Sequence, residues 1–231
     1  MSLNITLDIS VDDPNIPVID PIQALIRPSS LAIYDCQSSQ DLSGRGNHMT
    51  LSAANVITAT GITLTNTNGF IATPMDEPDE FTIISCHNLS GDPTTAKQLV
   101  GNFAPNNGFR WQLSSQFGGL VVSTEVEPET LPFTFYGAWT IQAVTVNATQ
   151  MQRITHSGAT TSAQLGGARK KSSNKIWING ADSSTNIFVK DGFNGTLGFM
   201  LVYDEVVPSN DIIKLMDVVT GIMADRGQPV P

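Results

Sequence analysis

Carboxylates are the first side chains in this sequence that could carry out a reaction. A glycosidase needs two of them, facing each other across the bond that is cut. The stretch STEVEPET places Glu125 and Glu127 on one face of a predicted strand, but Glu129 follows Pro128, which ends the alternation. The acidic stretch MDEPDEF is also interrupted by a proline. Both stretches are more typical of a solvated edge or loop than of a catalytic pair.

The histidines and cysteines show no catalytic or metal-binding spacing. His48, His87 and His156 lie in different segments, and the sequence has no G-x-S-x-G or H-E-x-x-H motif. Cys36 and Cys86 are fifty positions apart and form no zinc motif, so we expect two buried free thiols. We predict a protein that is not an enzyme, with no catalytic residues, no metal and no cofactor.

The stretch DLSGRGNHMTLS could be a phosphate loop, a calcium loop or a tight turn. A phosphate loop needs a helix N-terminus after its glycines, but strand-like sequence follows Gly46. A calcium loop needs several closely spaced carboxylates, and this stretch supplies only Asp41. We predict a turn in which Asp41 and Ser43 form hydrogen bonds with the local backbone, while Gly44 and Gly46 supply left-handed conformations.

Carbohydrate binding stays open as an alternative, since it needs an aromatic side chain to stack on a sugar and polar groups to bind its hydroxyls. Trp111 alternates with other apolar residues, which predicts a core position. The neighbours of Trp177, Ile176 and Ile178, point the opposite way, so Trp177 is predicted to lie on an outer or concave face. The loops APNNGFR and NGADSSTN could form a polar rim. The candidate ligand-binding residues are Trp177, Arg110, Asn107 and Asp182.

Alternation of apolar and polar residues dominates the chain. Runs such as NITLDISV, FRWQLSS and WTIQAVTVNAT alternate with period two and are separated by Gly, Asn, Asp, Ser and Pro. Many short strands without alternating helices predict an all-β, antiparallel two-sheet sandwich. One segment, VPSNDIIKLMDVVTGIMADRG, repeats apolar residues at helical spacing and predicts a short C-terminal helix over residues 208–226.

Length and charge limit the remaining possibilities. A chain of 231 residues fits one all-β domain, which we place at 31–231. Residues 1–30 contain four prolines and predict an extended arm, with one helical turn at PIQALI. The net charge of -9 disfavours nucleic-acid binding. The basic cluster ARKKSSNK is interpreted as a solvated loop, and no run is long enough for a membrane helix.

Several stretches, in their order along the chain, resemble the concanavalin A-like lectin/glucanase superfamily in its laminin G-like branch. They are LAIYDCQSSQDLSGRGNHMTLS, DEFTIIS, GFRWQLSSQFGGLVV, GAWTIQAVTVNAT and DGFNGTLGFMLVYDEVVPSNDIIKLM. The resemblance runs from Leu31 to Gly227 and implies a jelly roll of two antiparallel sheets. That fold hosts lectins, glycosidases, adhesion modules and structural parts, so it does not determine function. The final helix, ending in MADRG, is similar to versions in phage and prophage structural proteins.

We therefore expect a non-enzymatic phage virion structural protein, such as a capsid decoration protein or a tail or fibre component, assembled in the bacterial cytoplasm. The arm 1–30 would bind other virion proteins, and the sandwich would face outward, where it could contact a host-surface glycan. A closed homo-oligomer is expected, without nucleic-acid or membrane partners. Two alternatives remain open: a carbohydrate-binding adhesion module that recognises a host glycan, and a glycosidase or depolymerase.

Overall fold

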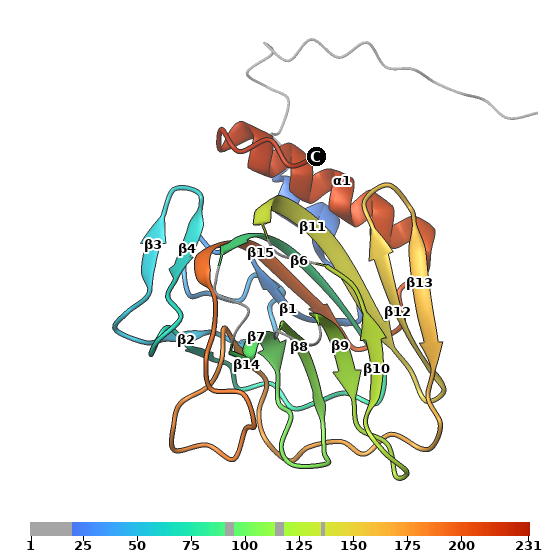
Figure 1. Cartoon of the computed structure of the whole chain (residues 1–231). Helices are drawn as coiled ribbons and strands as arrows, with labels where there is room; N and C mark the ends of the chain where they lie inside the picture. The colour runs from blue at the N-terminus through green and yellow to red at the C-terminus, as the bar shows by residue number, and fades with distance from the viewer. Residues whose placement is uncertain (1–19, 91–94, 114–117, 135–136) are drawn as a thin grey trace, which may run out of the picture.

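Two antiparallel sheets pack face to face, and a helix covers the outer face of one of them (Figure 1). The computed structural model describes residues 20–90, 95–113, 118–134 and 137–231. Sheet A contains, in spatial order, β13 (Thr160–Gln164), β12 (Gln150–Thr155), β11 (Gly137–Val146), β6 (Phe81–Ser90), β15 (Asn194–Tyr203), β4 (Gly61–Leu64) and β3 (Val56–Thr58), and β1 (Ser30–Tyr34) also pairs with β15. Sheet B contains β10 (Glu129–Pro132), β9 (Gly118–Val122), β8 (Phe109–Leu113), β7 (Lys97–Gly101), β14 (Trp177–Ile178), β5 (Ile71–Ala72) and β2 (Thr50–Leu51). The predicted all-β sandwich is confirmed.

Sheet A forms the middle layer of the molecule, so its central strands are buried on both faces. Along β6, Ile83 belongs to the core between the two sheets, while the next residue, Ile84, belongs to a second core beneath the helix. Sheet B supplies the other side of the first core, including the fully buried Trp111. A strand buried on both faces loses strict alternation, which explains why the apolar residues Ile83 and Ile84 are adjacent in β6.

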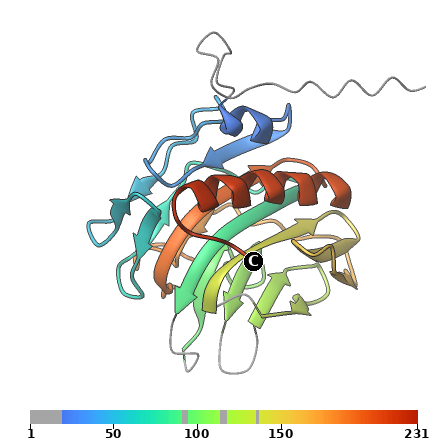
Figure 2. The same cartoon turned by 90° about the horizontal axis from the view of Figure 1, so that it is seen from above.

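The predicted C-terminal helix is present as α1 (Ser209–Asp225). Seen from above, it runs across the strands of sheet A, with the short 3-10 helix η1 (Pro21–Leu25) alongside it (Figure 2). Its buried residues recur at helical spacing, as the sequence pattern predicted: Ile212, Leu215, Met216, Val219 and Met223. This face packs on sheet A of the same chain, as expected for an amphipathic helix.

The segment just before β1 packs against the sandwich. The predicted helical turn is present as η1, and its Leu25 is fully buried in the core beneath α1. Tyr203 Oη donates a hydrogen bond of 2.9 Å to the Leu25 carbonyl oxygen. Arg27 forms ion pairs with Glu205 and Asp211, so residues 20–30 are fixed to the sandwich. Residues 1–19 of the expected arm lie outside the described residues.

The glycine-rich stretch after β1 is a turn built around one buried carboxylate. Asp41 is 6% exposed and accepts hydrogen bonds from the backbone N–H groups of Ile33, Ser43 and Asn47, at 2.9–3.0 Å. Gly44 and Gly46 have φ values of +83° and +77°, the left-handed conformations that favour glycine. The predicted turn is confirmed. The part of the chain that the structure describes holds no group of three or more acidic, His or Cys side chains that could bind a metal ion.

Both cysteines are free and buried, as predicted. Burial raises the pKa of the Cys86 thiol to about 12 and raises that of Cys36 well above its usual value. Because the thiolate is the reactive form, neither side chain is prepared for redox or nucleophilic chemistry. Within the described ranges, no helix is long and apolar enough to cross a membrane.

Candidate ligand-binding face

Three neighbouring strands bring Trp177 and Arg110 to the same face of sheet B. Trp177 on β14 pairs with Gly101 on β7, and Gly101 pairs with Arg110 on β8. Residues directly opposite each other in antiparallel strands point to the same side. Their neighbours Ile178 and Trp111 are buried between the sheets, so Trp177 and Arg110 point outward, away from sheet A. The predicted outer position of Trp177 and the predicted core position of Trp111 are both confirmed.

Gly101 leaves open the position between these two side chains. A Cβ atom there would lie 2.5 Å from the Phe109 carbonyl oxygen and 2.7 Å from the Arg110 Cα, so the backbone leaves no room for a larger residue. Two strand spacings separate Trp177 from Arg110, which is roughly 10 Å. The outer face of sheet B therefore presents an aromatic ring and a guanidinium group. Their separation is similar to the length of two linked sugar rings.

Trp177 is partly exposed and has a second aromatic ring beside it. Phe70 lies edge-on to Trp177, with 5.4 Å between the ring centroids. The ring pair stabilises the orientation of the indole, since edge-to-face aromatic pairs contribute beyond the area they bury. Phe70 precedes β5 and was not singled out in the sequence, because it lies in a turn-rich stretch without clear alternation.

Arg110 packs against two phenylalanine rings, which also contact each other edge to face with 6.3 Å between their centroids. The guanidinium carbon is 4.1 Å from the ring centroid of Phe103 and 4.9 Å from that of Phe188. Phe103 is buried, whereas Phe188 is 61% exposed and forms the outer side of the arrangement. The Phe188 N–H donates to the Phe103 carbonyl oxygen at 2.7 Å, which joins the loop after β7 to the loop after β14. We call Arg110 with these two rings the aromatic clamp.

Sequence reasoning found Arg110 but missed both rings of the aromatic clamp. In NIFVK the flanking Ile187 and Val189 are buried and Phe188 is exposed. That alternation was a usable signal that Phe188 points outward. Phe103 had no comparable signal, because its burial depends on a loop 85 positions later in the chain.

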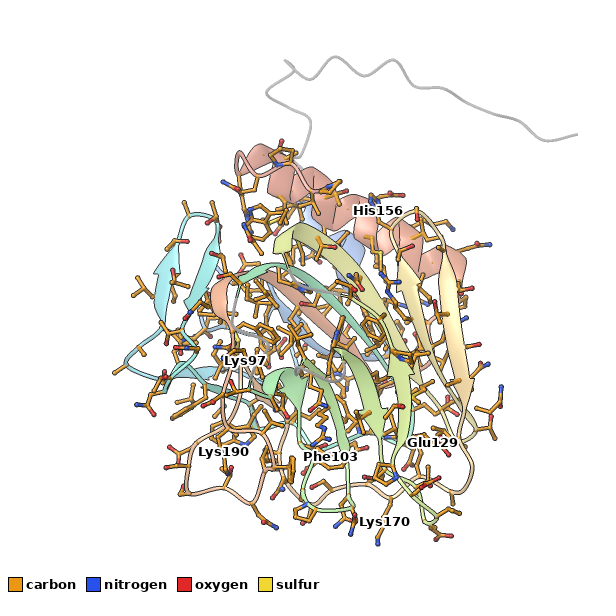
Figure 3. All side chains as sticks on the ribbon, viewed as in Figure 1. Lys97, Phe103, Glu129, His156, Lys170 and Lys190 are labelled. Carbon is orange, nitrogen blue, oxygen red and sulfur yellow. The ribbon has the colours of Figure 1, made fainter. Side chains whose placement is uncertain are left out.

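The other two candidate residues lie in the loops that border the aromatic clamp. Asn107 is in the tight turn after Phe103, where Ala104 and Asn107 exchange backbone hydrogen bonds of 2.9 and 3.1 Å. The carboxylate of Asp182 accepts hydrogen bonds from the hydroxyl and backbone N–H of Ser184, and these lower its pKa. Asp182 thus organises its own turn. Figure 3 shows Phe103 and Lys190, which mark the two loops, at the end of the sandwich away from α1.

A set of ion pairs fixes the base of the loop that carries Phe103 and Asn107. The basic stretch ARKKSSNK and the acidic stretch MDEPDEF pair with each other: Arg169 with Glu77, Lys171 with Asp79 and Lys175 with Asp76. The last two pairs are largely exposed, as predicted for solvated loops, and the first departs from that prediction. The Arg169–Glu77 pair is buried, with side chains 6% and 1% exposed. Glu77 also accepts a hydrogen bond of 3.0 Å from the side chain of Asn102, which precedes Phe103. We call these three pairs the charged belt.

The stretch STEVEPET also differs from its predicted form. β9 ends at Val122 and β10 begins at Glu129, so Glu125 and Glu127 lie in an exposed turn rather than on one face of a strand. The Thr124 hydroxyl donates to the Glu127 carbonyl oxygen at 2.7 Å and closes this turn. Side-chain to backbone bonds of this kind favour turns over strands, which is why the alternation in the sequence was misleading.

No protein-family model and no curated protein matches the sequence. The fold is similar to that of solved receptor-binding domains of botulinum neurotoxins. The binding domain of botulinum neurotoxin DC, in complex with SialylT, is 12% identical with a TM-score of 0.67, covering 83% of this chain and 52% of that one. A structure of botulinum neurotoxin type C, described as dependent on two ganglioside molecules to enter cells, is 13% identical with a TM-score of 0.67, covering 85% and 53%.

A third neighbour, the receptor-binding domain of botulinum neurotoxin type G, is 11% identical with a TM-score of 0.65, covering 83% of this chain and 52% of that one. At these identities the likeness concerns the fold alone, an all-β sandwich of two antiparallel sheets. Within that class, its neighbours are toxin receptor-binding domains. The chain spans about half the length of the neighbours it matches.

Proposed function

We propose that the protein is a non-enzymatic recognition module that binds carbohydrate on the outer face of sheet B. The observation that carries this proposal is the row Trp177–Gly101–Arg110, which places a partly exposed indole and a guanidinium on one face with a gap between them. An indole ring stacks on the apolar face of a sugar, while its edge and neighbouring polar groups bind hydroxyls. Asn107 and Asp182 supply polar groups at the border of this face.

The structural neighbours support the proposal only in part. One was solved in complex with SialylT, and another depends on interaction with two ganglioside molecules for cell entry, which is compatible with a sugar-binding role for a sandwich of this type. The match extends over half of each neighbour, so their ligands are not assigned to this chain. The proposal rests on the side chains of sheet B.

Replacing Trp177 with alanine is expected to weaken glycan binding at least about tenfold, because truncation of a central aromatic contact usually costs more than 1 kcal/mol. Trp177→Phe retains a ring on the same face and should keep most of the affinity. Binding would be measured by titration calorimetry with glycans first identified on an array, and thermal unfolding would confirm that both variants are folded. Unchanged binding by Trp177→Ala would place the sugar elsewhere, and the cleft of about 410 Å³ beside Arg153 and His156 would be examined next.

We also propose that the protein is a structural component of a phage virion, assembled in the bacterial cytoplasm and displayed through its N-terminal segment. The final helix, whose MADRG ending is similar to versions in phage and prophage structural proteins, supports this assignment. One observation favours attachment through residues 1–19: the chain is fixed from Asp20 onward by η1 and by the ion pairs of Arg27. A segment that precedes a fixed point can bind a partner without disturbing the sandwich. Closed homo-oligomers in the particle belong to the same proposal.

Deletion of residues 1–19 is expected to leave folding and glycan binding intact while abolishing incorporation into particles. Deletion of residues 1–30 is the wrong experiment, because it also removes buried Leu25, and losing such a side chain alone costs about 2–5 kcal/mol. The measurement is the amount of each protein in purified particles, with unfolding curves run in parallel. Normal incorporation of the protein lacking residues 1–19 would contradict attachment through this segment.

A further inference from the structure

Arg110 differs from the other arginines in having no hydrogen-bond acceptor within the described residues. Its Nε and Nη1 atoms are buried and unpaired. Every other arginine donates to at least one acceptor: Arg27 to Glu205, Arg45 to the carbonyl oxygens of Pro28 and Ser30, Arg153 to Gln142, Arg169 to Glu77, and Arg226 to Asp35. Arg110 therefore retains hydrogen-bonding capacity that the folded chain does not use.

A buried guanidinium without hydrogen-bond acceptors lowers the stability of the folded protein. Burial lowers the pKa of Arg110 to about 10, so the side chain is still a cation at neutral pH but lacks the solvation and partners that would stabilise its charge. The two rings of the aromatic clamp recover part of that loss through cation–π contacts. They cannot replace the hydrogen bonds, because aromatic faces do not satisfy the in-plane N–H groups of a guanidinium.

Asp182, an acidic residue on the neighbouring loop, does not serve as the partner. Asp182 is occupied by Ser184. The same loop adds a second cation, Lys190, whose ammonium group bonds to the Asp182 carbonyl oxygen at 3.1 Å and to the Thr185 hydroxyl at 2.8 Å. Lys190 interacts electrostatically with Asp182 on its own loop, so among the described residues of this region it is Arg110 that lacks an ion-pair partner, in a chain with a net charge of -9.

We propose that the aromatic clamp is a subsite for a carboxylated sugar, in which Arg110 binds the carboxylate; this rests on the proposed carbohydrate binding. The planar fork of a guanidinium matches the two oxygens of a carboxylate, and both forks of Arg110 are unused. For a ligand to reach the buried Nε and Nη1, the ring of Phe188, which is 61% exposed, would have to rotate away. Trp177, about 10 Å away on the same face, would stack on the adjoining sugar ring.

The charge distribution favours a single carboxylate over a polyanion. A strongly acidic protein repels ligands that carry many negative charges, so a polyphosphate or nucleic acid gains little from one arginine. A sugar with one carboxylate, such as a uronic or sialic acid within an otherwise neutral glycan, places its charge on Arg110 and leaves the rest of its surface uncharged.

The test compares matched glycans that differ only in the acidic group. Oligosaccharides ending in glucuronic acid would be compared with those ending in glucose, galacturonic acid with galactose, and sialylated glycans with the same glycans after sialic acid removal. The full-length protein is expected to bind the carboxylated member of at least one pair about tenfold or more tightly, as charge-assisted bidentate hydrogen bonds imply. This preference should decrease as salt is added.

Three variants assign the preference to Arg110. Arg110→Gln is expected to lose the preference while binding the neutral glycan as before, and Arg110→Lys, which keeps the charge without the fork, should retain only part of it. Arg45→Gln is the matched control: it removes the same charge from an exposed turn and should leave the preference unchanged. Thermal unfolding of each variant shows whether it is folded.

The outcomes separate this inference from the proposed function. Equal affinity for both members of every pair would overturn the carboxylate subsite while leaving carbohydrate binding in place. A preference that survives Arg110→Gln would place the acidic group elsewhere and would also overturn the assignment. Binding to no glycan of either kind would overturn both. If Arg110→Gln does not fold, the comparison of wild type with Arg110→Lys decides.

Discussion

Replacing Glu77 with alanine is expected to destabilise the protein by about 3–5 kcal/mol, the largest effect that we predict for a single substitution. The substitution leaves Arg169 as a buried charge without its carboxylate, since both side chains are almost completely inaccessible. It also removes the acceptor for the Asn102 side chain and for the Ser172 N–H, both at 3.0 Å. The measurement is the free energy of unfolding from urea denaturation.

The charged belt supplies its own control. Asp76 forms an ion pair with Lys175 in the same belt, but its side chain is 76% exposed, so Asp76→Asn should cost less than about 1 kcal/mol. The double variant Glu77→Leu with Arg169→Met should regain much of the lost stability, because it removes both charges rather than leaving one. Equal losses for Asp76→Asn and Glu77→Ala would show that burial of the pair has no particular importance.

Replacing Asp41 with alanine is expected to cost about 3 kcal/mol or more, because three backbone N–H groups lose their acceptor at once and each unsatisfied buried donor costs about 1–3 kcal/mol. Water will satisfy some of these donors, which keeps the total below the sum. One of them belongs to Ile33 in β1, so the loss extends into sheet A. Denaturant unfolding again provides the measurement.

Two further variants test the explanation for Asp41. Asp41→Asn keeps one acceptor oxygen and should give an intermediate loss. Ser43→Ala removes only the hydroxyl that donates to Asp41 at 2.8 Å, and it should cost about 1 kcal/mol. If Asp41→Ala were no more destabilising than Ser43→Ala, the turn would depend on its glycines rather than on the carboxylate.

Local pattern was sufficient to predict much of the fold. The alternation of FRWQL placed Trp111 in the core, and the spacing of apolar residues in the last segment located α1. The turn at Asp41 was predicted from Gly, Asn and Asp residues whose local conformational preferences do not depend on distant partners. The outward position of Trp177 followed from its two isoleucine neighbours.

Long-range pairing could not be obtained from the same patterns. Glu77 and Arg169 are 92 positions apart, and the sequence shows only that two charged stretches exist, so each was interpreted as solvated. The aromatic clamp joins Phe103 to Phe188 across two loops, and the alternation in NIFVK indicates only that Phe188 points outward, not which residues it contacts. The burial of Leu25 was not predicted either, because prolines flank it in the sequence and its position depends on the packing of α1.

The placement of η1 and α1 makes the two ends of the molecule different. Both the first described residues and the C-terminal Pro231 lie on the side of sheet A that carries α1, while Phe103 and Lys190 lie at the end away from it (Figures 1 and 3). Copies tethered through their N-terminal segments would present these loops toward the surroundings in parallel. In such an array, a site of millimolar affinity is enough for firm attachment, because each bound copy raises the effective concentration of the next. The attachment would then depend on the number of sites bound at once and not on the affinity of one site.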